Sequence, residues 1–270
     1  MFNHDAKLIQ SMGPMLQRVL IVDPQPASAR FVAGLMRDVC RPESWVAETS
    51  AQAIELAAEH DPQLVLAELS DGKVDGVALT RALRRSDLGC RKAPVILMTA
   101  HATAAGILAA RDAGVHEFLR KPFTVKDLLR RLEAVTLRPR DWVEAVDYVG
   151  PDRRRFNSAE FKGPLKRQAD QAGADDAVRI GQCVKILRSA LAAVDRDPAQ
   201  ALRAMLAQTT ELQLVCAASV DARLDMAVNE LHRYLFEAAS HTQRLDRNEA
   251  EKRAAPILAY LPPNGDRAAA

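Results

Sequence analysis

Four polar residues with the chemistry of a phosphoryl or cation site stand at the ends of short apolar runs in the first half of the chain. They are Asp23, Glu68, Thr99 and Lys121. Carboxylate and hydroxyl oxygens can bind divalent cations, and an ammonium group can pair with an anion such as a phosphoryl group. Polar residues also commonly end strands, so the residue types alone do not establish a site.

The apolar runs are rich in β-branched residues and leucine, which is typical of strands buried on both faces. They are RVLIVD (18–23), SWVAETS (44–50), QLVLAEL (63–69), APVILMTA (93–100) and VHEFLR (115–120). Segments with helical apolar spacing separate and follow them. This alternation predicts an α/β fold, a doubly wound (βα)5 parallel sheet with helices on both faces. The carboxyl ends of parallel strands share one edge, so we expect the four polar residues to converge there.

Four short motifs carry a resemblance to a known family. VLIVD ends at Asp23, VDG occupies 74–76, MTA occupies 98–100 and FLRKPF occupies 118–123. In this order and at these separations they make residues 18–137 similar to the CheY-like receiver domain of bacterial two-component response regulators, which has a flavodoxin-like fold.

The resemblance implies a site in which an aspartate ending the third strand takes a phosphoryl group. Two acids after the first strand hold magnesium there, and a hydroxyl and a lysine contact the phosphoryl. It assigns Asp23 to the first metal-binding acid, Thr99 to the switch hydroxyl and Lys121, before an expected cis-proline at Pro122, to the lysine.

The chain departs from the family pattern at three positions. Pro24 stands where the second acid belongs and offers no side-chain ligand, and Phe118 replaces the tyrosine often found at the switch position. Counting back from Gly76 by the family's spacing gives Glu68 at the phosphoacceptor position. Asp71 and Asp75 fall in the following loop and do not replace the missing aspartate.

Glutamate is one methylene longer than aspartate, which moves its carboxylate about 1.5 Å outward, towards the place of a phosphoryl oxygen. We therefore expect a degenerate receiver that does not accept phosphate and is held in one conformation by contacts among Glu68, Lys121 and Thr99. Two alternatives stay open: Glu68 accepts phosphate poorly, as a phosphorelay switch, or the site has decayed without consequence.

Residues 138–174 have the composition of a basic, proline-containing linker, and Gly-Pro-Asp at 150–152 favours a turn. The triplet Arg153, Arg154 and Arg155 could bind an anion, because guanidinium groups bind phosphate bidentately. An alternative function is therefore a cyclic-dinucleotide effector; the other interpretation is a solvated linker.

Residues 175–252 show apolar residues at alternating spacings of three and four, which predicts two or three helices, the first capped by Asp175 or Asp176 and the second starting at Asp197 and Pro198. Such helices bury their stripes against one another, the receiver or a second chain. His232 has neither flanking pattern of a phosphotransfer histidine, and residues 253–270 suggest a flexible tail.

Net charge is +2 and aromatic residues make up 4% of the chain, so no global field favours nucleic acid or lipid. No apolar stretch suffices for a membrane span, no secretory signal is visible, and no helix-turn-helix signature predicts direct DNA binding. The sequence thus predicts a cytoplasmic, non-enzymatic signalling protein without cofactor or metal. Its expected partners are a histidine kinase, a phosphotransferase, a downstream effector or a second copy joined through the C-terminal helices.

Overall fold

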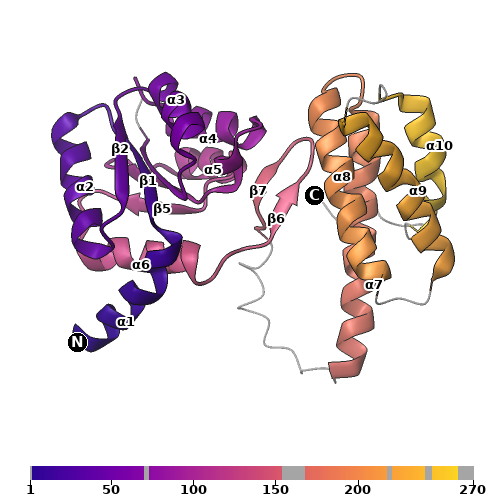
Figure 1. The fold of residues 1–270 in the computed structure, drawn as a ribbon, viewed down its shortest axis with the longest axis horizontal. Helices are drawn as coiled ribbons and strands as arrows, with labels where there is room; N and C mark the ends of the chain where they lie inside the picture. The colour runs from indigo at the N-terminus through magenta and orange to yellow at the C-terminus, as the bar shows by residue number, and fades with distance from the viewer. Residues whose placement is uncertain (1, 70–72, 154–167, 218–220, 241–244, 261–270) are drawn as a thin grey trace. The chain divides into compact units, whose positions relative to one another are not determined.

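The computed structural model describes residues 2–69, 73–153, 168–217, 221–240 and 245–260. These residues divide into two compact units (Figure 1). One comprises Met1–Val143 with Tyr148–Arg153, and the other comprises Glu144–Asp147 with Arg154–Ala270. Each unit has its own hydrophobic core.

The first unit contains a five-stranded parallel sheet in the order β2-β1-β3-β4-β5. The strands are β1 Arg18–Val22, β2 Glu43–Ala47, β3 Leu64–Glu68, β4 Val95–Thr99 and β5 Glu117–Arg120. The three central strands β1, β3 and β4 are buried almost throughout, as expected for a sheet covered on both faces. The predicted fold class is confirmed for this half of the chain.

Helices cover both faces of the sheet (Figure 1). One face packs against α2 Pro26–Val39, α6 Val125–Thr136 and an N-terminal helix, α1 Phe2–Met12, which the sequence did not suggest. The other face packs against α3 Ser50–His60, α4 Gly76–Arg85 and α5 Ala104–Asp112. Along β1, β3 and β4, successive buried side chains enter opposite cores, which is the two-residue period of a β-strand.

The turns after β2, β3, β4 and β5 are shaped by side chains that cap the next helix. Thr49, Asp75, Thr103 and Thr124 accept hydrogen bonds from main-chain N–H groups in the first turns of α3, α4, α5 and α6. Such caps satisfy N–H groups that the helix itself leaves without partners. The helices therefore start at defined residues, and the loops between strand and helix hold their shape.

After α6 the chain forms a two-stranded sheet of β6 Trp142–Glu144 and β7 Val149–Pro151. The turn predicted at Gly-Pro-Asp is therefore wrong, because Gly150 and Pro151 are in β7. Gly150 is needed there, since a Cβ atom on it would lie 2.6 Å from the Cα atom of Gly114. Close backbone approach, not a turn, explains this glycine.

The second unit is a helical bundle of α7 Gln168–Ala192, α8 Pro198–Cys216, α9 Ala222–Ala239 and α10 Arg247–Leu258. Asp197 caps α8 and Pro198 begins it, as predicted, whereas α7 begins well before Asp175. The expected tail from 253 also differs, because α10 continues to Leu258.

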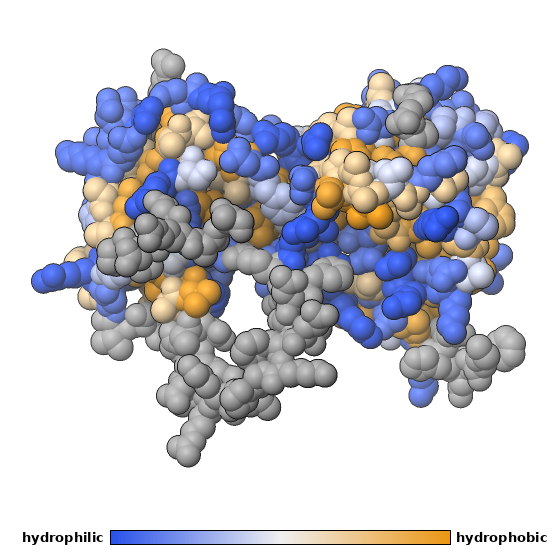
Figure 2. Space-filling view, turned by 180° about the vertical axis from the view of Figure 1, so that it is seen from behind, coloured by the Kyte–Doolittle hydropathy of each residue, from blue (hydrophilic) through white to orange (hydrophobic). Residues whose placement is uncertain are grey.

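The apolar residues that recur along the helices of this bundle are buried in its core, among them Leu187, Leu191, Leu212, Leu231 and Leu235. Four large apolar side chains of the bundle are exposed, namely Val178, Leu214, Met226 and Phe236. On the face in Figure 2, patches of apolar residues are interrupted by polar ones. Within the described ranges, no helix combines the length and the apolar character that crossing a membrane requires.

Candidate functional site

The carboxyl edge of the sheet brings together three of the four polar residues singled out in the sequence. Asp23 follows β1, Glu68 ends β3 and Lys121 follows β5, after which Pro122 takes the predicted cis peptide bond. The Lys121 ammonium group donates to Asp23 Oδ2 at 3.0 Å and also forms a very short ion pair with Glu68 Oε2. One cation thus joins the ends of three strands.

Ser28 is a fourth member of this cluster, and sequence reasoning missed it. Its hydroxyl donates to Asp23 Oδ2 at 2.5 Å and accepts a hydrogen bond from Lys121 Nζ at 3.0 Å. Ser28 lies in the first turn of α2, five residues after Asp23, and that spacing was the available signal. We call Asp23, Ser28, Glu68 and Lys121 the carboxyl-edge cluster.

The cluster is largely closed to solvent. The side chains of Asp23, Glu68 and Lys121 are 2%, 12% and 23% exposed. Burial raises the pKa of Glu68 above its usual value, a change that its hydrogen bond and ion pair with Lys121 only partly offset. Burial alone would lower the pKa of Lys121, but its hydrogen bonds with Glu68 and Asp23 outweigh that effect and raise it. The ammonium group therefore stays charged at neutral pH.

The oxygen atoms of the carboxyl-edge cluster do not fit the coordination of a magnesium ion. Asp23 Oδ1 accepts from the Gln25 N–H group at 2.9 Å, and Asp23 Oδ2 is shared by Ser28 and Lys121. Pro24 brings no ligand atom, and the lysine cation occupies the space beside both carboxylates. Magnesium requires several oxygen ligands in octahedral geometry. Nowhere in the described chain do three His, Cys, Asp or Glu side chains gather to hold a metal.

Thr99 and Phe118 lie at this edge of the sheet but outside the cluster. The Thr99 hydroxyl accepts a hydrogen bond from the main-chain N–H group of His101 at 3.0 Å. The main-chain N–H group of Lys121 donates to the main-chain carbonyl oxygen of Thr99. The expected side-chain contact of Thr99 with Glu68 and Lys121 is therefore absent. Phe118, in β5, packs against the core of the α3–α5 face.

The loop after β3 is held close to Glu68. Asp75 caps α4 by accepting from the N–H groups of Val77 and Ala78, so its carboxylate does not serve the cluster. A Cβ atom on Gly76 would lie 2.6 Å from the Glu68 carbonyl oxygen, which explains the glycine at this position. Asp71 is outside the described residues.

The arginine triplet is described only at its first member. The Arg153 guanidinium group donates to the Tyr148 hydroxyl at 3.0 Å and to the carbonyl oxygens of Arg111 and Val115 at 2.8 and 2.5 Å. Arg153 therefore holds the end of β7 against the receiver. Arg154 and Arg155 lie outside the described residues, so anion binding by the triplet stays a prediction.

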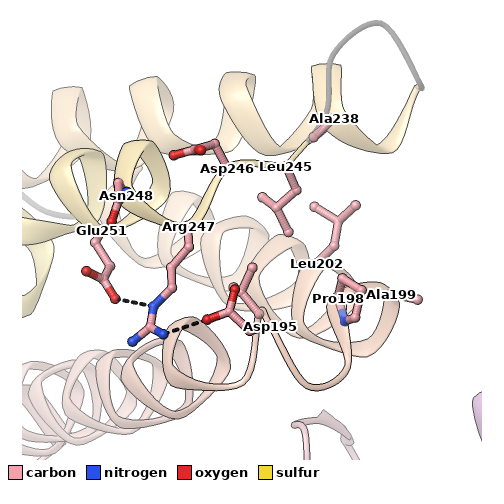
Figure 3. Close-up of a pocket in the computed structure, with 11 residues that line it drawn as sticks. Asp195, Pro198, Ala199, Leu202, Ala238, Leu245, Asp246, Arg247, Asn248 and Glu251 are labelled. Atoms are coloured by element: carbon pink, nitrogen blue, oxygen red, sulfur yellow. Dashed lines mark hydrogen bonds and ion pairs between the residues drawn. The ribbon is translucent and has the colours of Figure 1, made fainter.

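The helical unit contributes a groove of about 1050 Å³ between the start of α8, the end of α9 and the start of α10 (Figure 3). Arg247 crosses its rim, paired to Asp195 Oδ2 at 2.7 Å and to Glu251 Oε1 at 2.9 Å (Figure 3). His232 lies elsewhere in this unit, half-buried, with Nδ1 2.9 Å from the Thr209 hydroxyl oxygen.

Comparison with known proteins finds similarity for part of the first unit. The family model of the response regulator receiver domain matches residues 19–133. The DNA-binding response regulator MtrA of Mycolicibacterium smegmatis is 29% identical over 130 residues, which are 48% of this chain and 55% of MtrA. The transcriptional regulatory protein KdpE of Mycobacterium tuberculosis is 32% identical over 120 residues, 44% of this chain and 51% of KdpE. The chain thus spans about half the length of these relatives.

Two further proteins resemble the same region. The probable chemotaxis protein CheY of Rhizobium etli is 28% identical over 118 residues, 44% of this chain and 91% of that protein. The crystal structure of the Vibrio cholerae chemotaxis protein CheY4 superimposes with a TM-score of 0.42 at 20% identity, covering 44% of this chain and 98% of that one. Residues 19–133 form a response regulator receiver domain. In the chain this domain is followed by the helices α7–α10.

Proposed function

We propose that this receiver is a non-enzymatic, protein-binding module of two-component signalling that does not use phosphoryl transfer. The observation that carries the proposal is the contact of one lysine with both carboxylates of the carboxyl-edge cluster. In a receiver that is phosphorylated, the lysine cation is expected to stabilise the incoming phosphoryl group. Here Glu68 already supplies the negative charge that the lysine binds.

The position of Glu68 supports the same conclusion. Its longer side chain carries the carboxylate to Lys121, so the lysine is engaged without any modification. Asp23 has each carboxylate oxygen bonded within the chain, which opposes recruitment of a metal ion. A receiver in this state would bind its partner, a kinase, phosphotransferase or effector, independently of phosphorylation. Our proposal also includes a location in the cytoplasm and no direct binding of DNA, and both of these parts are supported by the sequence alone.

Treatment with acetyl phosphate and Mg²⁺, followed by intact-mass spectrometry, tests the proposal. We expect no phosphoryl adduct on the wild-type chain. The double variant Glu68→Asp with Pro24→Asp restores an aspartate and a second acid, and we expect it to gain an acid-stable, base-labile adduct.

Glu55→Asp, on the exposed face of α3, is the matched control and should behave as the wild type. An adduct on the wild-type chain that peptide mapping places at Glu68, or at an aspartate of the neighbouring loop, would contradict the proposal.

A further inference from the structure

The receiver has a second recess, at the edge of its sheet opposite to the carboxyl-edge cluster. Gln63, Pro94 and His116 immediately precede β3, β4 and β5, so they lie at the amino ends of these strands. Together with the end of α6 and with Pro139, Arg140 and Trp142, they line a recess of about 410 Å³. This volume is within the range of small-molecule sites, roughly 300–1000 Å³.

His116 presents a hydrogen-bond donor to this recess. The Val95 N–H group lies 3.3 Å from His116 Nδ1 and can only donate, so Nδ1 is the acceptor and the ring proton is on Nε2. Burial, followed by the charges of Arg84 and Arg140, holds the pKa of His116 well below its usual value, so the ring stays neutral. No residue in the described part of the chain accepts the Nε2 proton.

Two further side chains on the wall, Gln63 and Lys92, also offer donors. Gln63 Oε1 already accepts from the N–H groups of Gln17 and Arg18, at 2.8 and 3.2 Å, which leaves its NH2 group to face a ligand. Lys92 is exposed, and its Nζ atom lies 5.8 Å from the centroid of the Trp142 ring. The donors of His116, Gln63 and Lys92 favour a ligand that is rich in acceptors.

The charge balance favours an anion. Lys92 and Arg140 bring two cations to the recess against one carboxylate, Glu117. That carboxylate is already paired, with Arg131 Nη1 at 2.9 Å and Arg140 Nη2 at 2.6 Å. A bound anion would thus meet net positive charge in a partly desolvated site, where Coulomb attraction is stronger than in bulk water.

We propose that this recess is a binding site for a small organic anion, with its carboxylate or phosphate on Lys92 and the Nε2–H group of His116. Its apolar part would contact Met15, Pro94 and Pro139, which complete the wall. The site lies within the first unit and does not depend on the state of the carboxyl-edge cluster.

Trp142 lines the recess and provides a reporter. The chain has two tryptophans, so Trp45→Phe leaves Trp142 as the sole indole. In the full-length Trp45→Phe protein, Trp142 emission and isothermal titration calorimetry would follow addition of benzoate, phenyl phosphate and the neutral benzamide. We expect saturable binding of at least one of the two anions and none of benzamide; the anion that binds identifies the headgroup.

Lys92→Gln, added to Trp45→Phe, should weaken anion binding about tenfold, which corresponds to about 1.4 kcal/mol. Lys126→Gln, at an exposed lysine of α6, should leave it unchanged. The proposal is overturned if neither anion saturates, if benzamide binds as well as the anions, or if Lys92→Gln binds like its parent.

Discussion

Lys121 is the residue on which the carboxyl-edge cluster depends, because it is the cation that faces the buried carboxylates of Asp23 and Glu68. A buried charge without its partner is strongly destabilising, typically by about 3–5 kcal/mol. The cluster therefore links the chemistry of the site to the stability of the receiver.

Replacing Lys121 by methionine should lower the free energy of unfolding of the receiver by roughly 3 kcal/mol, since both carboxylates stay buried without their cation. Adding Glu68→Gln to Lys121→Met should recover part of this loss, because one uncompensated charge is removed. Urea denaturation measures both effects. Lys126→Met, on the exposed side of α6, is the control, and its change in the free energy of unfolding should be near zero. A double variant less stable than Lys121→Met would contradict the assignment.

His116 gives the receiver a pH dependence whose sign follows from its lowered pKa. The unfolded chain takes up a proton near the ordinary value of 6.5, whereas the folded chain does not. The stability contribution of His116 is therefore complete above pH 6.5 and is lost as the pH falls towards the folded-state pKa.

We expect the free energy of unfolding to decrease below pH 6.5 by up to about 1.4 kcal/mol per pH unit from this residue. Urea denaturation across this range should show a smaller slope for His116→Gln than for the wild type. Equal slopes for His116→Gln and the wild type would show that His116 is not held neutral.

At the scale of elements, the approach of α4 to β3 fixes the loop beside Glu68. Gly76→Ala places a Cβ atom 2.6 Å from the Glu68 carbonyl oxygen and 2.7 Å from Leu97 Cδ2, so helix or strand must shift. We expect a loss on the order of 2 kcal/mol in thermal or urea unfolding.

Gly34→Ala, inside α2, is the matched control, and we expect it to change the stability of the receiver in the opposite direction. The nearest atom to its Cβ is 4.0 Å away, so alanine should stabilise the receiver by about 0.5–1 kcal/mol through its better helix propensity. If both substitutions change stability in the same direction, close packing at Gly76 is not the reason for that glycine.

Elements with strong local signals could be predicted from the sequence. The five strands follow from dense β-branched runs, and the start of α8 follows from Asp197 before Pro198, because capping and the fixed φ of proline act within one turn. The convergence of Asp23, Glu68 and Lys121 follows from parallel topology together with the family resemblance.

Features that depend on tertiary packing could not be predicted. Ser28 enters the carboxyl-edge cluster through hydrogen bonds with Asp23 and with Lys121, and the spacing of five residues from Asp23 does not by itself indicate the contact with Lys121. Arg153 donates to carbonyl oxygens about forty positions earlier in the chain, at Arg111 and Val115, and no local pattern indicates such contacts. The first turns of α7 have few apolar residues, so periodicity placed its start too late.

At the scale of the whole molecule, the chain contains two units with separate cores. Leu231 is fully buried in the helical core, and truncation of such a side chain costs about 2–5 kcal/mol. Leu231→Ala should therefore destabilise the helical unit, whereas Lys121→Met destabilises the receiver.

Hydrogen exchange measured by mass spectrometry should separate the two effects, since protection is resolved by peptide. We expect Leu231→Ala to reduce protection in α8 and α9, and Lys121→Met to reduce it in β1 and β3. Loss of protection throughout the chain in both variants would mean that the two units unfold as one cooperative body.

The central claim is that Lys121 already holds Glu68 in place of a phosphoryl group. The most direct test is to record ¹⁵N–¹H spectra of the wild-type protein with and without beryllofluoride and Mg²⁺, a mimic of the phosphorylated state. The account predicts no change at the amides of Asp23, Glu68, Thr99 and Lys121, whereas the variant with Glu68→Asp and Pro24→Asp should respond. Saturable shifts of these amides in the wild-type protein would contradict the account.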